Sequence, residues 1–228
     1  MLSERGMSTD DLLPRYACEK CSDTGYLENG ELCPCARLKL AGRKYSSSGI
    51  NENAGFDRFN ENIFKDPEQL KRTRRAAEIC AQYAENLEIG GAKGLLLMGE
   101  TGLGKTFLMD SIGREAIRRG YSVKKYTAYN LIDAALRAVR RHEAGPELTG
   151  AELLLLDDLG TEPMIPGVTI ETLFAAINER QFSGKATVIA TNLTKNELFT
   201  QYGERIFSRL FASREYAAIT LRGKDLRM

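Results

Sequence analysis

Residues 99–106 read Gly-Glu-Thr-Gly-Leu-Gly-Lys-Thr, a complete G-x-x-x-x-G-K-[ST] phosphate-binding loop. The apolar residues 94–98 before the loop are typical of a buried strand, and residues 105–119 place apolar side chains at helical spacing. In such a strand–loop–helix unit, backbone N–H groups and the positive end of the helix attract phosphate oxygens. A glycine-rich turn that arose by chance would lack this context, so the sequence predicts a nucleotide-binding domain.

Each part of the loop has an expected contact with bound ATP. Glycines let the backbone turn tightly, the lysine would bind the β- and γ-phosphates, and the threonine would ligate Mg²⁺. ATP and Mg²⁺ are therefore the expected ligands. The predicted ATP-binding residues are Gly99, Glu100, Thr101, Gly102, Leu103, Gly104, Lys105 and Thr106.

The composition is that of a globular protein without a membrane partner. The 228 residues are 43% apolar and carry a net charge of +1, so the overall charge indicates no nucleic-acid partner. Residues 1–15 contain no signal-peptide core, and the longest aliphatic stretch, residues 153–156, is too short to span a membrane. We therefore expect a cytoplasmic protein whose five cysteines are metal ligands or core residues rather than disulfides.

The chain divides into four blocks. Residues 1–15 are a predicted tail, residues 16–36 hold four of the five cysteines, residues 37–62 are a linker, and residues 63–228 are one domain. Within that domain helical and strand patterns alternate, which predicts an α/β fold with a parallel sheet flanked by helices. The expected helices are 67–87, 105–119, 131–141, 169–181, 195–202 and 205–214, and the expected strands are 94–98, 121–126, 153–157, 187–191 and 217–221.

Polar side chains end two further predicted strands. Asp157 and Asp158 follow four leucines, and Asn192 ends the strand that begins at Thr187. Since the carboxyl ends of parallel strands share one edge of a sheet, these side chains should lie beside the phosphate loop. Asp157 is then expected to bind Mg²⁺, Asp158 to orient or deprotonate the attacking water, and Asn192 to contact that water or the γ-phosphate. An acidic turn and an ordinary turn asparagine are the simpler interpretations.

Arg205 and Arg209 lie four residues apart, which places both on one face of the last predicted helix. Guanidinium groups stabilise the charge that develops in phosphoryl transfer, and a neighbouring subunit can supply them. A solvated basic face is the simpler interpretation of the same spacing.

These motifs, taken in this order, resemble those of the AAA+ ATPases. More narrowly, residues 56–226 look like the DnaC/IstB branch, which includes the replicative helicase loaders of the DnaC and DnaI type. The quoted features are the phosphate loop, the Asp-Asp strand, the Thr-Asn strand, Glu-Arg-x-x-Ser-Arg-Leu at 204–210, Phe-x-x-Phe at 56–59, Tyr-Thr-Ala-x-x-Leu-Ile at 126–132, and Gly-Lys-Asp-Leu-Arg at 223–227.

The resemblance implies roles that the spacing alone does not. Asn192 would take the sensor-1 role, and Arg205 would be an arginine finger in a neighbour's site, with Arg209 close behind. This implies self-association in the ATP state. AAA+ proteins usually carry a helical lid after the last strand, whereas helicase loaders resemble this chain in having a reduced or absent lid. A weak ATPase that acts as a switch is therefore expected.

Four cysteines are predicted to bind zinc. Cys18, Cys21, Cys33 and Cys35 form C-x₂-C and C-x-C pairs that eleven residues separate. Four thiolates can close a tetrahedral site, which folds short segments that have no core of their own. This segment also resembles the one that precedes the ATPase domain in Gram-positive-type loaders. A redox pair is the alternative, and Cys80 is expected in the core.

The resemblance also implies the partners, namely a replicative helicase and single-stranded DNA. Basic residues at 37–44, 124–125 and 137–141, with Tyr126 and Tyr129 nearby, could form a DNA-binding groove or simply a solvated surface. Family members with this cysteine segment usually have a longer helical region before it, which docks on the helicase, whereas seventeen residues precede Cys18 here. The expectation is therefore either a truncated or alternatively started form, or docking through the zinc module itself. The alternative functions are an IstB-type helper of a transposase and a non-hydrolysing ATP-gated adaptor.

Overall fold

The computed structural model describes residues 16–36, 48–87, 94–142, 145–146, 148–211 and 216–227. The chain separates into two compact units, one within residues 1–43 and the other within residues 44–228. The tail predicted over residues 1–15 and the basic stretch 37–44 lie outside the described residues.

The described part of the first unit, residues 16–36, is a small set of turns around a β-bridge between Tyr26 and Leu32. The carboxylate of Asp23 accepts hydrogen bonds from the backbone N–H groups of Ala17 and Cys18, at 2.9 and 3.0 Å. The N–H of Cys33 donates to the carbonyl of Gly25 at 2.8 Å, which brings the two cysteine pairs together. Because these residues offer few apolar side chains to bury, the cysteines are what this unit packs around.

A five-stranded parallel sheet forms the centre of the second unit, in the order β2-β3-β4-β1-β5. The strands are β1 (Gly94–Met98), β2 (Val123–Thr127), β3 (Leu153–Leu159), β4 (Ala186–Thr191) and β5 (Tyr216–Thr220). All four neighbouring pairs are parallel, and Met98 at the end of β1 pairs with Thr191 of β4 and Thr220 of β5. The carboxyl ends of the strands therefore meet at one edge. This confirms the predicted α/β fold with the strand order of AAA+ ATPases.

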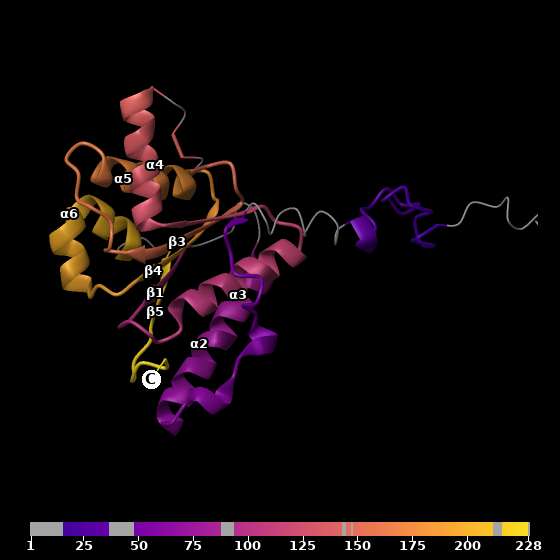
Figure 1. Cartoon of the computed structure of the whole chain (residues 1–228), viewed down its shortest axis with the longest axis horizontal. Helices are drawn as coiled ribbons and strands as arrows, with labels where there is room; N and C mark the ends of the chain where they lie inside the picture. The colour runs from indigo at the N-terminus through magenta and orange to yellow at the C-terminus, as the bar shows by residue number, and fades with distance from the viewer. Residues whose placement is uncertain are drawn as a thin grey trace, which may run out of the picture. The chain divides into compact units, whose positions relative to one another are not determined.

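Helices cover both faces of this sheet, as Figure 1 shows. α2 (Pro67–Glu85) and α3 (Lys105–Arg118) lie on one side, and α4 (Ala128–Arg141), α5 (Thr169–Phe182) and α6 (Lys195–Phe211) lie on the other. The core of the second side includes Leu96, Leu131, Leu156, Leu173, Ile189 and Ile206. Cys80 is fully buried in α2, which confirms its place in the core. No described helix has the length and apolarity that a membrane span requires.

The two helices predicted at 195–202 and 205–214 correspond to the two halves of one kinked helix, α6. α6 continues from Lys195 to Phe211, with a break at Gly203, where φ is 73° and ψ is 174°. This left-handed φ favours glycine, which has no Cβ to clash with the backbone. The predicted gap between the two helices is therefore a kink within α6, and residues 212–214 lie outside the described part of the chain.

The second unit begins earlier than the sequence predicts. Residues 48–62, expected to be part of a linker, pack against α3, and Ile50 and Ala54 are buried. Arg114 of α3 donates to the carbonyl of Ala54 at 3.2 Å and to the carboxylate of Asp57 at 2.6 Å. Two short 3-10 helices, η3 (Phe56–Arg58) and η4 (Glu61–Ile63), follow. Apolar residues are too sparse in this segment to show a periodic pattern, so the boundary at 63 could not be placed correctly.

Candidate functional site

The phosphate loop joins the end of β1 to the start of α3 at the carboxyl edge of the sheet. Gly102 and Gly104 have φ values of 79° and 89°, which residues with a side chain rarely adopt. Gly104 is the N-cap of α3, so the first N–H groups of that helix, which have no partner within the helix, face the loop. The backbone is therefore shaped as an anion-binding cradle.

Lys105 holds the loop to the neighbouring strand. Its ammonium donates to the carbonyls of Gly99 and Glu100, both at 2.7 Å, and to Oδ1 of Asn192 at 2.6 Å. Burial lowers the pKa of Lys105, while the negative charges of Asp158 and Asp157 oppose this shift. The structure thus brings Lys105, Asn192 and the loop together, as the motif order predicts.

The acidic end of β3 lies beside the first turn of α3. Thr106 Oγ1 lies 3.2 Å from Asp157 Oδ1, which also accepts the N–H of Asp158 at 3.1 Å. The hydroxyl and the carboxylate are the hard oxygen ligands that Mg²⁺ prefers, so these residues fit that ion.

Asp158 is displaced from the regular strand. The pairing of β3 with β4 is interrupted between Leu156 and Leu159, and Asp158 has a φ of 54°. This irregularity directs the half-buried Asp158 side chain into the pocket described below. Burial raises the pKa of Asp158, the negative charge of Asp157 adds to this effect, and Lys105 opposes it.

The side chain of Lys125 is largely buried, whereas the sequence predicts a basic residue of the surface or of a DNA-binding groove. Its ammonium lies 2.8 Å from Asp110 Oδ1 and 3.2 Å from Asp157 Oδ2. The side chains of Lys125, Asp110 and Asp157 are only 11%, 4% and 5% exposed. Burial acts to lower the pKa of Lys125, but Asp110 and Asp157 outweigh it and raise that pKa. Lys125 therefore points into the protein and is not part of a DNA-binding groove.

A pocket of about 520 Å³ adjoins the loop, and two chemically different groups of side chains line it, here called its aromatic end and its polar end. Phe59, Phe64 and Phe107 form an aromatic end, in which Phe59 lies 5.6 and 6.5 Å from the other two ring centroids. The polar end includes Lys105, Thr106, Asp158 and Asn192. Leu226 and Arg227 also line the pocket. The motifs at 56–59 and 223–227 do not by themselves predict that their residues line this pocket.

The two arginines of α6 lie elsewhere. The guanidinium carbons of Arg205 and Arg209 are 4.2 and 4.4 Å from the ring centroid of Phe174 in α5. Arg209 also donates to Oδ1 of Asn178, at 2.9 and 2.6 Å. Neither arginine is among the residues that line the pocket. Within the described chain, the structure does not bring them to the phosphate loop.

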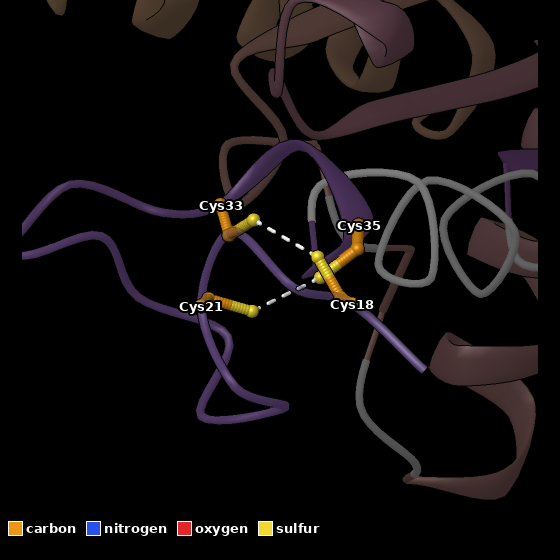
Figure 2. Close-up of side chains that lie close together, drawn as sticks. All are labelled: Cys18, Cys21, Cys33 and Cys35. Atoms are coloured by element: carbon orange, nitrogen blue, oxygen red, sulfur yellow. Dashed lines mark hydrogen bonds between the residues drawn. The ribbon is translucent and has the colours of Figure 1, made fainter. Parts of the chain in front are cut away.

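The four cysteines of the first unit converge on one point, as Figure 2 shows. All four sulfur atoms lie within 4.8 Å of one another, with 3.7 Å between Cys18 and Cys33 and 3.5 Å between Cys21 and Cys35. A tetrahedron of Zn–S bonds of about 2.3 Å has sulfur–sulfur edges of about 3.8 Å, so this spacing fits zinc. The cysteines are free thiols rather than disulfides.

The comparisons with known proteins agree with this geometry. IstB-like ATP binding protein is the family that matches, over residues 82–210. The chain is 25% identical over 155 residues to the replicative helicase loader DnaI of Bacillus subtilis (strain 168), which is 64% of this chain and 49% of that protein. It is 26% identical over 178 residues to the replicative helicase loader DnaC of Escherichia coli (strain K12), or 74% of this chain and 68% of that protein.

Structural similarity extends the match. A crystal structure of the DnaC helicase loader superposes with a TM-score of 0.62 at 21% identity, over 75% of this chain and 97% of that chain. The chain therefore has the fold of that protein, but spans only about half the length of DnaI. The match to residues 82–210 covers more than half of the sequence, and the chain belongs to the family of IstB-like ATP-binding proteins, as an AAA+ protein distantly homologous to the DnaC and DnaI helicase loaders.

Proposed function

We propose that this protein is an ATP-controlled switch that loads a replicative DNA helicase onto DNA and hydrolyses ATP weakly. One observation carries the ATPase part of the proposal. Lys105, Thr106, Asp158 and Asn192, from three separate motifs, line one pocket, and Asp157 contacts Thr106. The distant homology to DnaC and DnaI supports the loader part.

ATP would occupy the pocket along its length. The aromatic end at Phe59, Phe64 and Phe107 suits a purine base, since aromatic rings stack favourably. Lys105 would exchange its backbone carbonyl partners for the β- and γ-phosphates, while residues 99–104 offer their N–H groups. Thr106 and Asp157 would hold Mg²⁺, which neutralises charge on the phosphate oxygens when bound.

Hydrolysis would need residues from two subunits. Asp158 would orient or deprotonate the attacking water, and Asn192 would contact that water or the γ-phosphate. Arg205 and Arg209 lie outside the pocket of their own chain. Arg205 would therefore act as an arginine finger in the pocket of a neighbouring subunit. ATP would therefore promote self-association.

The first unit would bind zinc through Cys18, Cys21, Cys33 and Cys35. The sulfur separations support a tetrahedral site, and four protein ligands leave no open position for catalysis. Zinc would then stabilise the turns that lack a hydrophobic core of their own.

Single-stranded DNA would bind near α4. Tyr129 is 54% exposed, and the ammonium of Lys124 lies 5.7 Å from the ring centroid of Tyr126. Aromatic and basic side chains suit stacking bases and the phosphate backbone, and of these residues Tyr129 is exposed while Lys124 and Tyr126 are half-buried.

Two measurements test the proposal. The chain, mixed with the replicative helicase of its host, is passed over a sizing column with mass detection, once with ATP and once with ADP. A complex that depends on the nucleotide supports a loader, and no complex with either nucleotide contradicts it. In the second measurement, Lys105→Ala should abolish nucleotide binding, and unchanged binding would contradict the site.

Two alternatives remain testable in the same assay. The family match favours an IstB-type helper of a transposase, which would bind transposase in place of helicase. A non-hydrolysing ATP-gated adaptor would form the complex with ATP but release no ADP, with or without DNA.

A further inference from the structure

The turn after β3 begins at Asp158, whose side chain lines the nucleotide pocket. The carbonyl of Asp158 accepts hydrogen bonds from the backbone N–H and the hydroxyl of Thr161, at 3.1 and 2.9 Å. The carbonyl of Leu159 accepts the hydroxyl of Thr191 at 2.6 Å, which ties the same turn to β4. The turn therefore has a fixed position beside the neighbouring strand.

A buried carboxylate joins this turn to α6. Glu162 is 5% exposed, and its Oε2 accepts the backbone N–H of Gly160 at 2.9 Å. Its Oε1 accepts the hydroxyl of Tyr202 in α6. Burying a carboxylate is costly unless protein hydrogen bonds replace those of water. The two bonds therefore make this contact between the turn and α6 specific, in addition to apolar packing.

Tyr202 lies at the kink of α6. The next residue, Gly203, has the left-handed φ of 73° at which the two halves of the helix meet. The second half carries both Arg205 and Arg209. The bond from the Tyr202 hydroxyl is thus made one residue before the break, where it can fix the direction of the half that carries the arginines.

Burial holds the Tyr202 hydroxyl in place as a hydrogen-bond donor. Tyr202 is 2% exposed and belongs to the apolar core with Leu198 and Ile206, from the adjacent turns of α6. Burial raises the pKa of Tyr202, and the hydrogen bond to the Glu162 carboxylate and its charge add to this effect. The hydroxyl therefore stays protonated. Its oxygen also accepts Nε2 of Gln201 at 3.2 Å.

We propose that Glu162 and Tyr202 are positioning residues for ATP hydrolysis in an assembly of several copies, because their hydrogen bond fixes the arginine-bearing half of α6 against the turn that follows Asp158. This inference rests on the proposed function, in which α6 supplies an arginine to a neighbour's pocket. Neither side chain is among the described residues that line the pocket of its own chain. The turnover rate should therefore depend on this bond, whereas nucleotide affinity should not.

Tyr202→Phe removes the hydroxyl and keeps the buried ring. In the full chain, at concentrations that permit assembly, it should lower ADP production at saturating ATP about fivefold or more, since a small displacement of a catalytic group is costly in rate. ATP affinity, measured by titration calorimetry, should stay within about twofold. Tyr121→Phe is the matched control, because the Tyr121 ring contacts Arg119 before the start of β2 and should affect neither quantity. Urea unfolding establishes that each variant is folded under the assay conditions.

A mixing experiment separates an effect through α6 from an effect on the chain's own pocket. Asp158→Asn chains should hydrolyse little ATP but present an intact α6 to a neighbour. Mixed with Tyr202→Phe chains, they should raise the turnover per Tyr202→Phe chain. The same mixture made with the double variant Arg205→Ala, Arg209→Ala is the control, because an intact neighbour should replace its missing arginines.

A rise in both mixtures supports the inference. No rise with Tyr202→Phe, together with a rise in the arginine control, overturns the inference and leaves the proposed function intact. Turnover by Tyr202→Phe equal to that of the unchanged chain, or an equal loss of ATP affinity and turnover, overturns it in the same way. No rise in the arginine control contradicts the neighbouring-arginine step of the proposed function, and the inference fails with it.

Discussion

Lys125 sits between two buried carboxylates, Asp110 of α3 and Asp157 of β3. The three side chains together carry one net negative charge, so the lysine keeps the carboxylates from repelling each other at close range. Asp157 in turn contacts Thr106, the predicted Mg²⁺ ligand. Lys125, which does not line the pocket, can therefore decide how the Asp157 carboxylate is oriented.

Replacing Lys125 by methionine should destabilise the protein by roughly 3–5 kcal/mol, because it leaves two buried carboxylates without their cation. Urea unfolding measures this loss. Lys124→Met is the control, since that ammonium lies over the Tyr126 ring, and it should cost less than about 1 kcal/mol. The double variant Asp110→Asn, Lys125→Met should recover most of the loss. Equal losses in the two single lysine variants would contradict the account.

Cys18 and Cys80 should differ in thiol reactivity in metal-free protein. Hydrogen bonding, chiefly with Cys35, lowers the pKa of Cys18 to about 7, whereas burial raises the pKa of Cys80 to about 12. Thiolates are the reactive form, so the rate of Cys18 should rise as the pH passes from 6 to 8, while Cys80 stays protonated and inert. A chromogenic disulfide reagent measures these rates. A fast phase that survives in Cys18→Ser, or that zinc does not suppress, would contradict the prediction.

At the scale of elements, the predictable parts of the fold are those whose pattern is local. The strand, loop and helix over 94–119 are contiguous, so their periodicity and glycines identify them without knowledge of distant contacts. Residues 48–62 and 221–227 are different. They are held by Arg114 and Gln69, which are far away in sequence, and short irregular segments have no period that could reveal such contacts.

The site residues also differ in whether the local sequence pattern predicts their positions. Lys105, Thr106, Asp157 and Asn192 follow strands whose ends must meet in a parallel sheet, so the sequence predicts their proximity. The aromatic end of the pocket and the burial of Lys125 depend on side-chain packing. Lys125 follows another lysine in a strand, and this pattern predicts a surface residue. Its burial results from the packing of β2 against β3 and α3, which the local pattern does not reveal.

Gly203 offers a test at the level of one element. Gly203→Ala should cost about 1–2 kcal/mol, because alanine is strained at the left-handed φ of 73° although the space around it is open. Gly145→Ala is the control, since it too has open space but no left-handed φ, and it should be neutral or slightly stabilising. Thermal unfolding separates the two. Equal midpoints would contradict a strained kink in α6.

At the scale of the whole molecule, each chain carries a pocket and, on α6, an arginine that does not reach it. Under the proposed function, a chain of this kind would be an incomplete ATPase by itself. Association of several copies would complete each pocket with a neighbour's Arg205, and ATP between two copies would favour that association. Nucleotide binding and nucleotide turnover should therefore respond differently to changes in α6.

Arg205→Ala should leave nucleotide binding by the dilute chain unchanged and lower hydrolysis about tenfold or more at concentrations that permit assembly. The ADP produced per chain is measured across a range of protein concentrations. Arg140→Ala, at an exposed position of α4, is the control and should match the unchanged chain. Wild-type turnover by Arg205→Ala under assembling conditions would exclude the role in a neighbour's site.

The two ends of the second unit both contribute walls to the nucleotide pocket, Phe59 and Phe64 from its first residues and Leu226 and Arg227 from its last. A load that pulled these two wall segments apart would act directly on the nucleotide pocket. Bound nucleotide would then act as a clasp and raise the rupture force in a single-molecule stretching experiment. Nucleotide affinity in a switch built in this way would respond to tension on the chain as well as to the concentration of nucleotide.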